Sequence, residues 1–250
     1  MALTIAGSDP SGGAGIQADL KTFHRFGVYG EAVITLLTVQ NTVAVRRVEC
    51  VAPDLVEQQI RAVLEDIPPD AIKLGALGNI AIIEAVAAAL AHSTIPLVID
   101  PVMISKHGAP LMNADAVASF KRLLIPRAFL ITPNLPEALA LTGEDDPKAA
   151  AQALFESGAR AVLIKGGHLE GERSDDLLLY NGWTEFPQKR IETRHTHGTG
   201  CTLSAAITAE LAKRLDLRQA VANAKAFVTE AIRTAPGLGH GSGPLNHFAN

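Results

Sequence analysis

The sequence has little of what marks several large protein classes. It contains only 2 cysteines among 250 residues, too few for a disulfide scaffold and typical of a reducing compartment. It also has no excess of positive charge, because 22 Lys and Arg stand against 26 Asp and Glu for a formal net charge of −4. Nucleic-acid binders usually carry a basic patch, so we expect no nucleic-acid partner.

Long apolar runs and leader segments are missing as well. The apolar stretches fall short of the roughly 18–20 residues that a membrane span needs. Met1 leads directly into a strand-like run without a basic leader, so we expect no signal peptide and no membrane association. Together with the low cysteine content, this predicts a cytoplasmic protein.

Several catalytic motifs do not occur in the sequence. It lacks the P-loop pattern G-x-x-x-x-G-K-[ST], as well as C-x-x-C, H-E-x-x-H and G-x-S-x-G. The first glycine-rich loop lacks the G-x-G-x-x-G spacing, which disfavours a dinucleotide enzyme.

What the chain does have is a high apolar content. Hydrophobic residues make up 48% and charged residues 19%, enough to exclude disorder and to build a sizeable core. No linker, repeat or low-complexity tract divides the sequence. We therefore expect a single domain over residues 1–250.

Short apolar runs alternate with amphipathic segments along the chain. The near-continuous apolarity of the short runs is typical of strands buried on both faces, so the alternation predicts an α/β fold with a mostly parallel sheet. Asn113, Asp146 and Asp216 are candidate N-caps, the last with Gln219 as a capping box. The predicted strands are 3–6, 32–39, 71–74, 97–99, 129–131 and 161–164, and the predicted helices are 16–26, 53–66, 80–91, 114–124, 148–157, 202–215 and 217–233.

Two segments break the alternation. Residues 43–51 alternate Val with Arg, and residues 177–191 contain Asn181-Gly182 between short β-type runs. These segments predict small antiparallel strands at an edge or in a flap.

Polar residues follow each predicted strand. Because ligands bind at the carboxyl ends of strands in open α/β sheets, we expect these residues to share one edge. The set suggests a phosphorylated ligand with a divalent ion; it includes the glycine-rich segment 7–15, Gln40, Asp100, Asn134, Glu137, Lys165 and the turn 198–201.

The turn before the last long helical region carries Gly198, Thr199, Gly200 and Cys201. Free backbone N–H groups at a helix N-terminus form an anion site, although a simple tight turn is the alternative. A cysteine there is expected to have a lowered pKa, so its thiolate could accept a proton from a substrate hydroxyl. The alternative for Cys201 is a small packing residue in the first turn.

Asp100, Glu137 and Lys165 are candidates for charge chemistry. Two carboxylates with phosphate oxygens and water suit Mg²⁺, and a strand-end lysine can neutralise a transferring phosphoryl group. The alternatives are helix capping by Asp100, a surface position for Glu137 and a solvated Lys165. For His168 and His197, which flank this region, packing or turn roles are favoured over catalysis.

Taken together, these segments resemble a known family. The matching stretches are 6–23, 40–42, 100–103, 132–138, 165–168, 197–202 and 239–241 with 244–245. The chain resembles the bacterial hydroxymethylpyrimidine/phosphomethylpyrimidine kinases of the ribokinase-like superfamily. The resemblance implies a three-layer α/β/α fold and ATP-dependent phosphorylation of 4-amino-5-hydroxymethyl-2-methylpyrimidine to its mono- and then its diphosphate, in thiamine diphosphate biosynthesis.

The resemblance also implies roles for individual residues. Cys201 would be the base, with Lys165 beside an anion hole of Gly198, Thr199 and Gly200. Asp100 and Glu137 would organise Mg²⁺, and Asn134, Lys165 and Gly200 would face ATP. The substrate would be bound by Gln40 and by Gly7, Ala14, Gly15 and Asp19. Related enzymes are often dimers, which implies a homodimer.

The sequence departs from the family pattern at Ala76, where methionine is expected and where alanine leaves more room near the substrate ring. Two alternative functions remain. A pyridoxal or pyridoxine kinase shares the fold and anion hole, and a metabolite-binding protein without catalysis could use the same fold.

Overall fold

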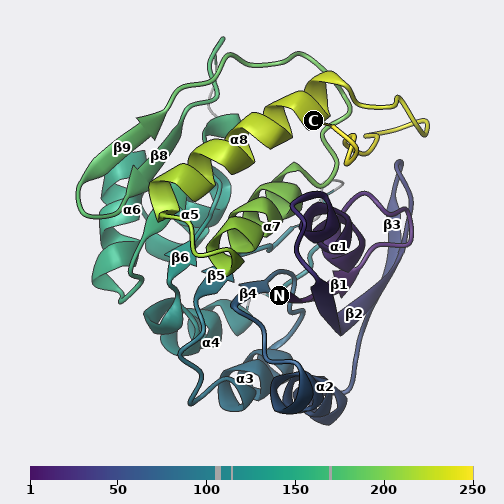
Figure 1. The fold of residues 1–250 in the computed structure, drawn as a ribbon, viewed down its shortest axis with the longest axis vertical. Helices are drawn as coiled ribbons and strands as arrows, with labels where there is room; N and C mark the ends of the chain where they lie inside the picture. Colours follow the sequence, from purple (N-terminus) through teal and green to yellow (C-terminus); the bar gives the residue numbers. More distant parts are fainter. Residues whose placement is uncertain (105–107, 114, 169–170, 250) are drawn as a thin grey trace.

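The computed structural model describes residues 1–104, 108–113, 115–168 and 171–249. Its centre is a nine-stranded sheet with the strand order β3-β2-β1-β4-β5-β6-β7-β8-β9 (Figure 1). The strands from β2 to β7 in this order pair in parallel, whereas β3, β8 and β9 pair antiparallel at the two edges. The strands are β1 (Ala2–Ser8), β2 (Gly30–Gln40), β3 (Val45–Cys50), β4 (Ala71–Leu74), β5 (Leu97–Ile99), β6 (Leu130–Ile131), β7 (Val162–Ile164), β8 (Asp176–Leu179) and β9 (Trp183–Phe186).

Helices cover both faces of this sheet. One core cluster joins it to α2–α6, and the other joins it to α1, α7 and α8. Within β5, Leu97 and Ile99 belong to the first cluster and Val98 to the second, because successive side chains of a strand point to opposite faces. The helices are α1 (Gly15–Arg25), α2 (Pro53–Asp66), α3 (Ile80–Ala89), α4 (Ala116–Leu123), α5 (Leu135–Thr142), α6 (Pro147–Glu156), α7 (Thr199–Ala212) and α8 (Leu217–Arg233), with short 3-10 turns at Ile125–Arg127 and Gly166–His168.

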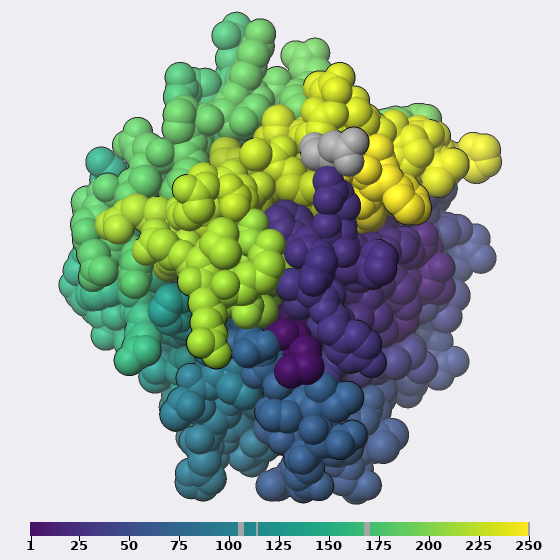
Figure 2. Space-filling model, in the orientation of Figure 1, coloured from purple at the N-terminus to yellow at the C-terminus, as the bar shows by residue number. Residues whose placement is uncertain are grey.

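N-terminal and C-terminal segments of the chain pack together on one face. In Figure 2 the N-terminal part, in purple, lies against the C-terminal helices in yellow-green, and α1 packs on α7. None of the helices in the described ranges is long and apolar enough to cross a membrane.

The strand order reverses beside β1. The chain passes from β1 to β2 on one side and later returns to place β4 on the other side. Such a switch point opens a crevice at the carboxyl ends of the strands. This crevice lies between the loop after β1 and the segment after β4.

The predicted alternation of strands and helices is confirmed. The six expected strands correspond to β1, β2, β4, β5, β6 and β7, and the expected bounds of β4, β5, α2 and α8 match the structure. The antiparallel edges are also found: residues 43–51 contribute β3, and residues 177–191 contribute most of β8 and all of β9. Leu179 pairs with Trp183, so residues 180–182 form the hairpin loop, in which Asn181 and Gly182 have positive φ of 49° and 100°.

Some helix boundaries differ from the predictions. Helix α5 was not among the predicted helices, and the expected α4 start at residue 114 lies outside the described residues. Asn113 is not the N-cap of α4. That position is Asp115, without a side-chain cap, and the Asn113 N–H donates to the Gly78 carbonyl.

The other two predicted caps gave different results. Asp146 caps α6 as expected, accepting from the N–H groups of Lys148 and Ala149. Asp216 caps α8 through the Arg218 N–H. The expected pairing with Gln219 is wrong, since that side chain donates to Asn223 one turn further on.

Candidate active site

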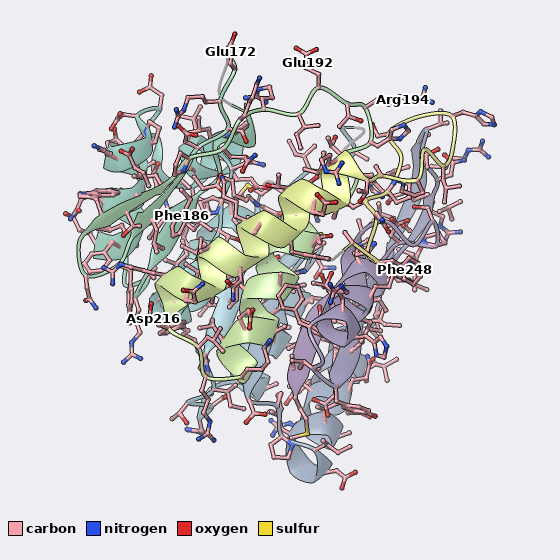
Figure 3. All side chains as sticks on the ribbon, turned by 45° about the horizontal axis from the view of Figure 1, so that its top comes forward. Glu172, Phe186, Glu192, Arg194, Asp216 and Phe248 are labelled. Atoms are coloured by element: carbon pink, nitrogen blue, oxygen red, sulfur yellow. The ribbon has the colours of Figure 1, made fainter. Side chains whose placement is uncertain are left out.

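A cavity of about 820 Å³ lies at the carboxyl edge of the parallel strands, a volume typical of small-molecule sites. Figure 3 shows the segment that carries Glu192 and Arg194 running across this end of the molecule, whereas Asp216 marks the opposite end of α8. All of the predicted site residues except Asp19 line the cavity: Gly7, Ala14, Gly15, Gln40, Asp100, Asn134, Glu137, Lys165, Gly198, Thr199, Gly200 and Cys201.

The predicted anion turn forms the start of α7, which begins at Thr199, three residues earlier than expected. Gly198 is its N-cap with φ of 82°, and a Cβ there would lie 1.8 Å from the Gly13 carbonyl oxygen. Only glycine fits this close, left-handed position. Because a glycine cap has no side chain to satisfy the first helical N–H groups, those of Gly200 and Cys201 remain available to an anion at the cavity wall.

Lys165 lies between the two predicted carboxylates. Its Nζ is 2.7 Å from Asp100 Oδ1 and 3.8 Å from Glu137 Oε2. Burial alone would lower the pKa of Lys165, but Asp100 and Glu137 raise it well above its usual value. Lys165 is therefore a permanent cation at the cavity wall and not a solvated strand-end lysine.

Glu137 serves two purposes in the fold. Its Oε2 accepts from the Asn134 N–H while its own N–H donates to Asn134 Oδ1, so the pair forms a capping box at α5. Burial, which Lys165 opposes and Asp100 strengthens, raises the pKa of Glu137 to about 7. With Asn134 Oδ1 occupied by the cap, the amide NH₂ group is the part of this side chain that can donate to a ligand.

The expected low pKa of Cys201 is wrong. Burial raises the pKa of its thiol to about 11, and the charges of Asp100 and Asp19 add to that effect. Lys73 and an N–H from Gly15 act in the opposite direction. The loss of solvent therefore outweighs the effect of Lys73 and of the Gly15 N–H.

The expected substrate contact of Asp19 is also wrong. Asp19 and Lys73 are completely buried and form an ion pair of 2.7 Å between Oδ2 and Nζ, and Thr4 Oγ1 donates to the same Asp19 oxygen at 2.6 Å. Lys73, not Asp19, lines the cavity. A charged residue inside the apolar strand run 71–74 was the sequence signal for such a pair, since a buried lysine requires a partner.

For His197, the sequence favoured a packing or turn role over catalysis, and the structure places it in the cavity wall. Its Nε2 lies 2.7 Å from Asp9 Oδ2 and 3.2 Å from the side-chain amide of Gln40. Three segments far apart in sequence meet here: the loop after β1, the end of β2 and the entry to α7. Asp9 lies within the predicted segment 7–15, but no spacing rule pairs it with His197.

A second ion pair supports the Lys165 segment. Lys225 of α8 binds Asp176 of β8 at 2.7 Å, and Asp176 Oδ1 accepts from the Gly166 N–H at 2.9 Å. Both charged residues line the cavity. The pair fixes the backbone directly after Lys165.

The Asp100 and Glu137 pair has the chemistry that a divalent cation needs. Mg²⁺ takes one or two carboxylates and completes its octahedron with phosphate and water oxygens. The charge of Asp100 helps to raise the pKa of Glu137, a repulsion that a cation would relieve. Within the described ranges no group of three or more His, Cys, Asp or Glu could hold a metal ion, so phosphate and water would supply the remaining ligands.

Phosphoryl transfer depends on positive charge and backbone donors already in place around the transferred group. Lys165 and the first turn of α7 provide both in one cavity, which places this protein among small-molecule kinases. The chain belongs to the phosphomethylpyrimidine kinase family, whose sequence model matches residues 9–246.

Individual relatives agree with this assignment. The hydroxymethylpyrimidine/phosphomethylpyrimidine kinase of Bacillus subtilis is 48% identical over 256 residues, covering 99% of this chain and 94% of its own. A phosphomethylpyrimidine kinase structure from Clostridium difficile has a TM-score of 0.82 and 44% identity, covering 92% of this chain and 98% of its own. The expected family, kinase activity and ribokinase-like α/β/α fold are confirmed.

A pyridoxal kinase is similar in structure. The Staphylococcus aureus enzyme in complex with AMP-PCP and pyridoxal has a TM-score of 0.91 and 37% identity, covering 99% of this chain and 93% of its own. That neighbour binds an ATP analogue together with a ring substrate.

Proposed function

We propose that this kinase transfers the γ-phosphoryl group of ATP to the hydroxymethyl group of 4-amino-5-hydroxymethyl-2-methylpyrimidine, and then phosphorylates the monophosphate to the diphosphate. The observation that carries the proposal is the placement of Lys165 and the first turn of α7 in one cavity with Gln40. The relatives named for both pyrimidine steps support the substrate.

Each group has a proposed role. Asp100 and Glu137 would hold Mg²⁺, which when bound would neutralise phosphate charge. Lys165 and the N–H groups of Gly200 and Cys201 would hold the oxygens of the transferred group, where negative charge is concentrated. The Asn134 amide would donate to the nucleotide phosphates.

Cys201 is the proposed acceptor of the substrate hydroxyl proton. Because the pKa of its thiol is about 11, the thiolate is a minor form near neutral pH. Lys73 is the charge that most favours this thiolate. Gly7, Ala14, Gly15 and Gln40 would enclose the pyrimidine.

Product analysis by mass spectrometry tests the proposal. After incubation with ATP, Mg²⁺ and the hydroxymethylpyrimidine, both the mono- and the diphosphate should form. If neither product forms, and no ring alcohol that is tried causes ATP turnover, the result would instead support a metabolite-binding protein.

Pyridoxine kinase activity is the second candidate, because the pyridoxal-bound neighbour has a similar fold and Ala76 lines the cavity as a small residue. A competition assay with both alcohols separates the two functions. Much faster phosphorylation of pyridoxine would reject the pyrimidine assignment.

We also propose that residues 1–250 form one kinase domain that works as a cytoplasmic homodimer. The continuous nine-stranded sheet supports one domain, and the two free cysteines suit a reducing compartment. Leu37, Val39 and Val43 are at least half exposed at the β2–β3 edge, an apolar edge that a second copy could cover. Light scattering after size-exclusion chromatography tests the dimer.

A further inference from the structure

The protonation state of Asp9 follows from its hydrogen bonds. Oδ1 accepts from the N–H and the hydroxyl of Ser11 at 2.8 and 2.7 Å, and Oδ2 accepts from the Ala14 N–H at 3.0 Å. Both oxygens are surrounded by donors, which is the environment of a carboxylate and not of an acid. Although burial opposes it, the hydrogen bonds from His197 and Ser11 lower the pKa of Asp9.

An ionised Asp9 determines which atom of His197 carries a proton. Oδ2 can only accept, so the 2.7 Å contact requires a proton on His197 Nε2. This conclusion holds whether the ring is neutral or charged. The ring packs closely on Gly13, where an added Cβ would lie 2.5 Å from His197 Cδ2. The backbone of His197 is held as well, because its main-chain N–H donates to the Gly243 carbonyl.

Gln40 must then turn its oxygen toward His197. An Nε2–H group cannot accept a hydrogen bond from an amide NH₂, yet Gln40 Nε2 lies 3.2 Å from it in the structure, so the amide has to be turned end for end. The single Nε2 proton is then shared between Asp9 Oδ2 and the Gln40 oxygen. The two ends of an amide have the same shape, so hydrogen-bond chemistry decides which end faces the imidazole. We propose that Asp9 and His197 together fix the Gln40 side chain with its oxygen on His197 and its NH₂ group toward the substrate, which makes His197 a specificity-determining positioning residue.

The fixed amide selects one class of ligand edge. A donor in this position recognises a ring nitrogen with a free lone pair, and it disfavours a protonated ring nitrogen or another donor at the same place. This inference rests on the proposed function, because it assumes that Gln40 contacts the ring of the phosphorylated alcohol. It adds the polarity of that contact and the two residues that set it.

Substitutions at Gln40 test the polarity. Gln40→Glu keeps the size and an oxygen for His197 but has no donor for the ring, whereas Gln40→Leu has neither. We expect both variants to raise the KM for the pyrimidine by about tenfold or more, with the KM for ATP within about twofold of the parent. If Gln40→Glu retains the parent KM while Gln40→Leu does not, the ring needs an acceptor and the proposal is wrong.

Substitutions at His197 test its positioning role. Gln places an N–H close to the position of Nε2, so His197→Gln should recover most of the pyrimidine affinity that His197→Leu loses. His24→Leu on the exposed side of α1 is the matched control for the same chemical change. The role of His197 would be purely structural if His197→Leu lost affinity for the pyrimidine and for ATP equally, or if His197→Gln recovered no pyrimidine affinity.

The tautomer gives a readout that needs no substrate. A ¹⁵N–¹H correlation spectrum of the ligand-free protein at pH 7, with His197 assigned by its loss in His197→Gln, should show a protonated Nε2. An unprotonated Nε2 would overturn the inference even if both pyrimidine products form. Conversely, absence of pyrimidine turnover in the parent would reject the proposed function, while this spectrum would still decide the state of His197.

Discussion

Lys165 Nζ donates to Asp100 Oδ1 over 2.7 Å, although the two residues follow strands that are not neighbours. Asp100 follows β5, Lys165 follows β7, and β6 lies between them. Glu137, in the first turn of the helix after β6, completes the group at 3.8 Å. The register of three parallel strands thus concentrates one positive and two negative charges at one point of the cavity.

Removing the Lys165 charge should reduce turnover far more than binding of the alcohol. In Lys165→Met we expect kcat to fall about 100- to 1000-fold, the range for losing one preorganised transition-state donor. Steady-state kinetics with both substrates measures this. Lys148→Met on the exposed side of α6 is the control, and an unchanged kcat in Lys165→Met would remove the lysine from the mechanism.

The ionisation of Cys201 can be followed by alkylation. The thiolate is the reactive form, so the iodoacetamide rate in a Cys50→Ser background should rise with pH toward a midpoint of about 11. A midpoint at or below about 8.5, the value of a free cysteine, would contradict the effect of burial.

The proposed role of Cys201 in proton transfer has a separate test. Cys201→Ala should retain the fold and ATP binding but lose most turnover. Parent turnover should increase with pH, because the thiolate fraction of Cys201 rises as the pH approaches its pKa of about 11. Undiminished turnover in Cys201→Ala would exclude the thiol as proton acceptor.

Glu137 should make stability depend on pH. Its pKa is about 7 in the folded protein against 4.5 for an ordinary glutamate, so the folded state binds the proton more tightly. The resulting stabilisation is complete below about pH 4.5 and disappears as pH rises through about 7, a change of about 3 kcal/mol at most. Urea unfolding of the parent and of Glu137→Gln, in which glutamine can keep the capping box, should diverge over this window; parallel curves would contradict the raised pKa.

The buried pair of Asp19 and Lys73 should show strong coupling. Lys73→Met or Asp19→Asn alone leaves one buried charge unpaired and should destabilise the protein by about 3–5 kcal/mol. The double variant should lose much less stability than the two single variants lose together. Additive losses in a double-mutant cycle would show that the two side chains do not depend on one another.

Ala76 should influence the choice of ring. Ala76→Met would reduce the space in the cavity, which should lower kcat/KM for the more heavily substituted pyridoxine by about tenfold or more relative to the pyrimidine. The KM for ATP serves as the internal control. An unchanged ratio would place Ala76 away from the ring.

Local sequence determined the elements and their order. The near-continuous apolarity of 71–74 and 97–99 predicted two strands with correct bounds, because both faces of these strands are buried. Asp146 before a proline identified the start of α6, and Asn181-Gly182 identified a hairpin, since these depend only on neighbouring residues. The carboxyl ends of parallel strands must share one edge, so the predicted site residues, all except Asp19, line the cavity.

Tertiary structure alone decided how those residues work. Burial and the nearby carboxylates raise the pKa of Cys201 where the helix N-terminus by itself predicts a lower one. Asp19 pairs with Lys73 across 54 positions, and His197 meets Asp9 across 188. Such pairs and the loss of solvent around them arise only when strands and loops distant in sequence pack together, and no local pattern encodes the electrostatics that result.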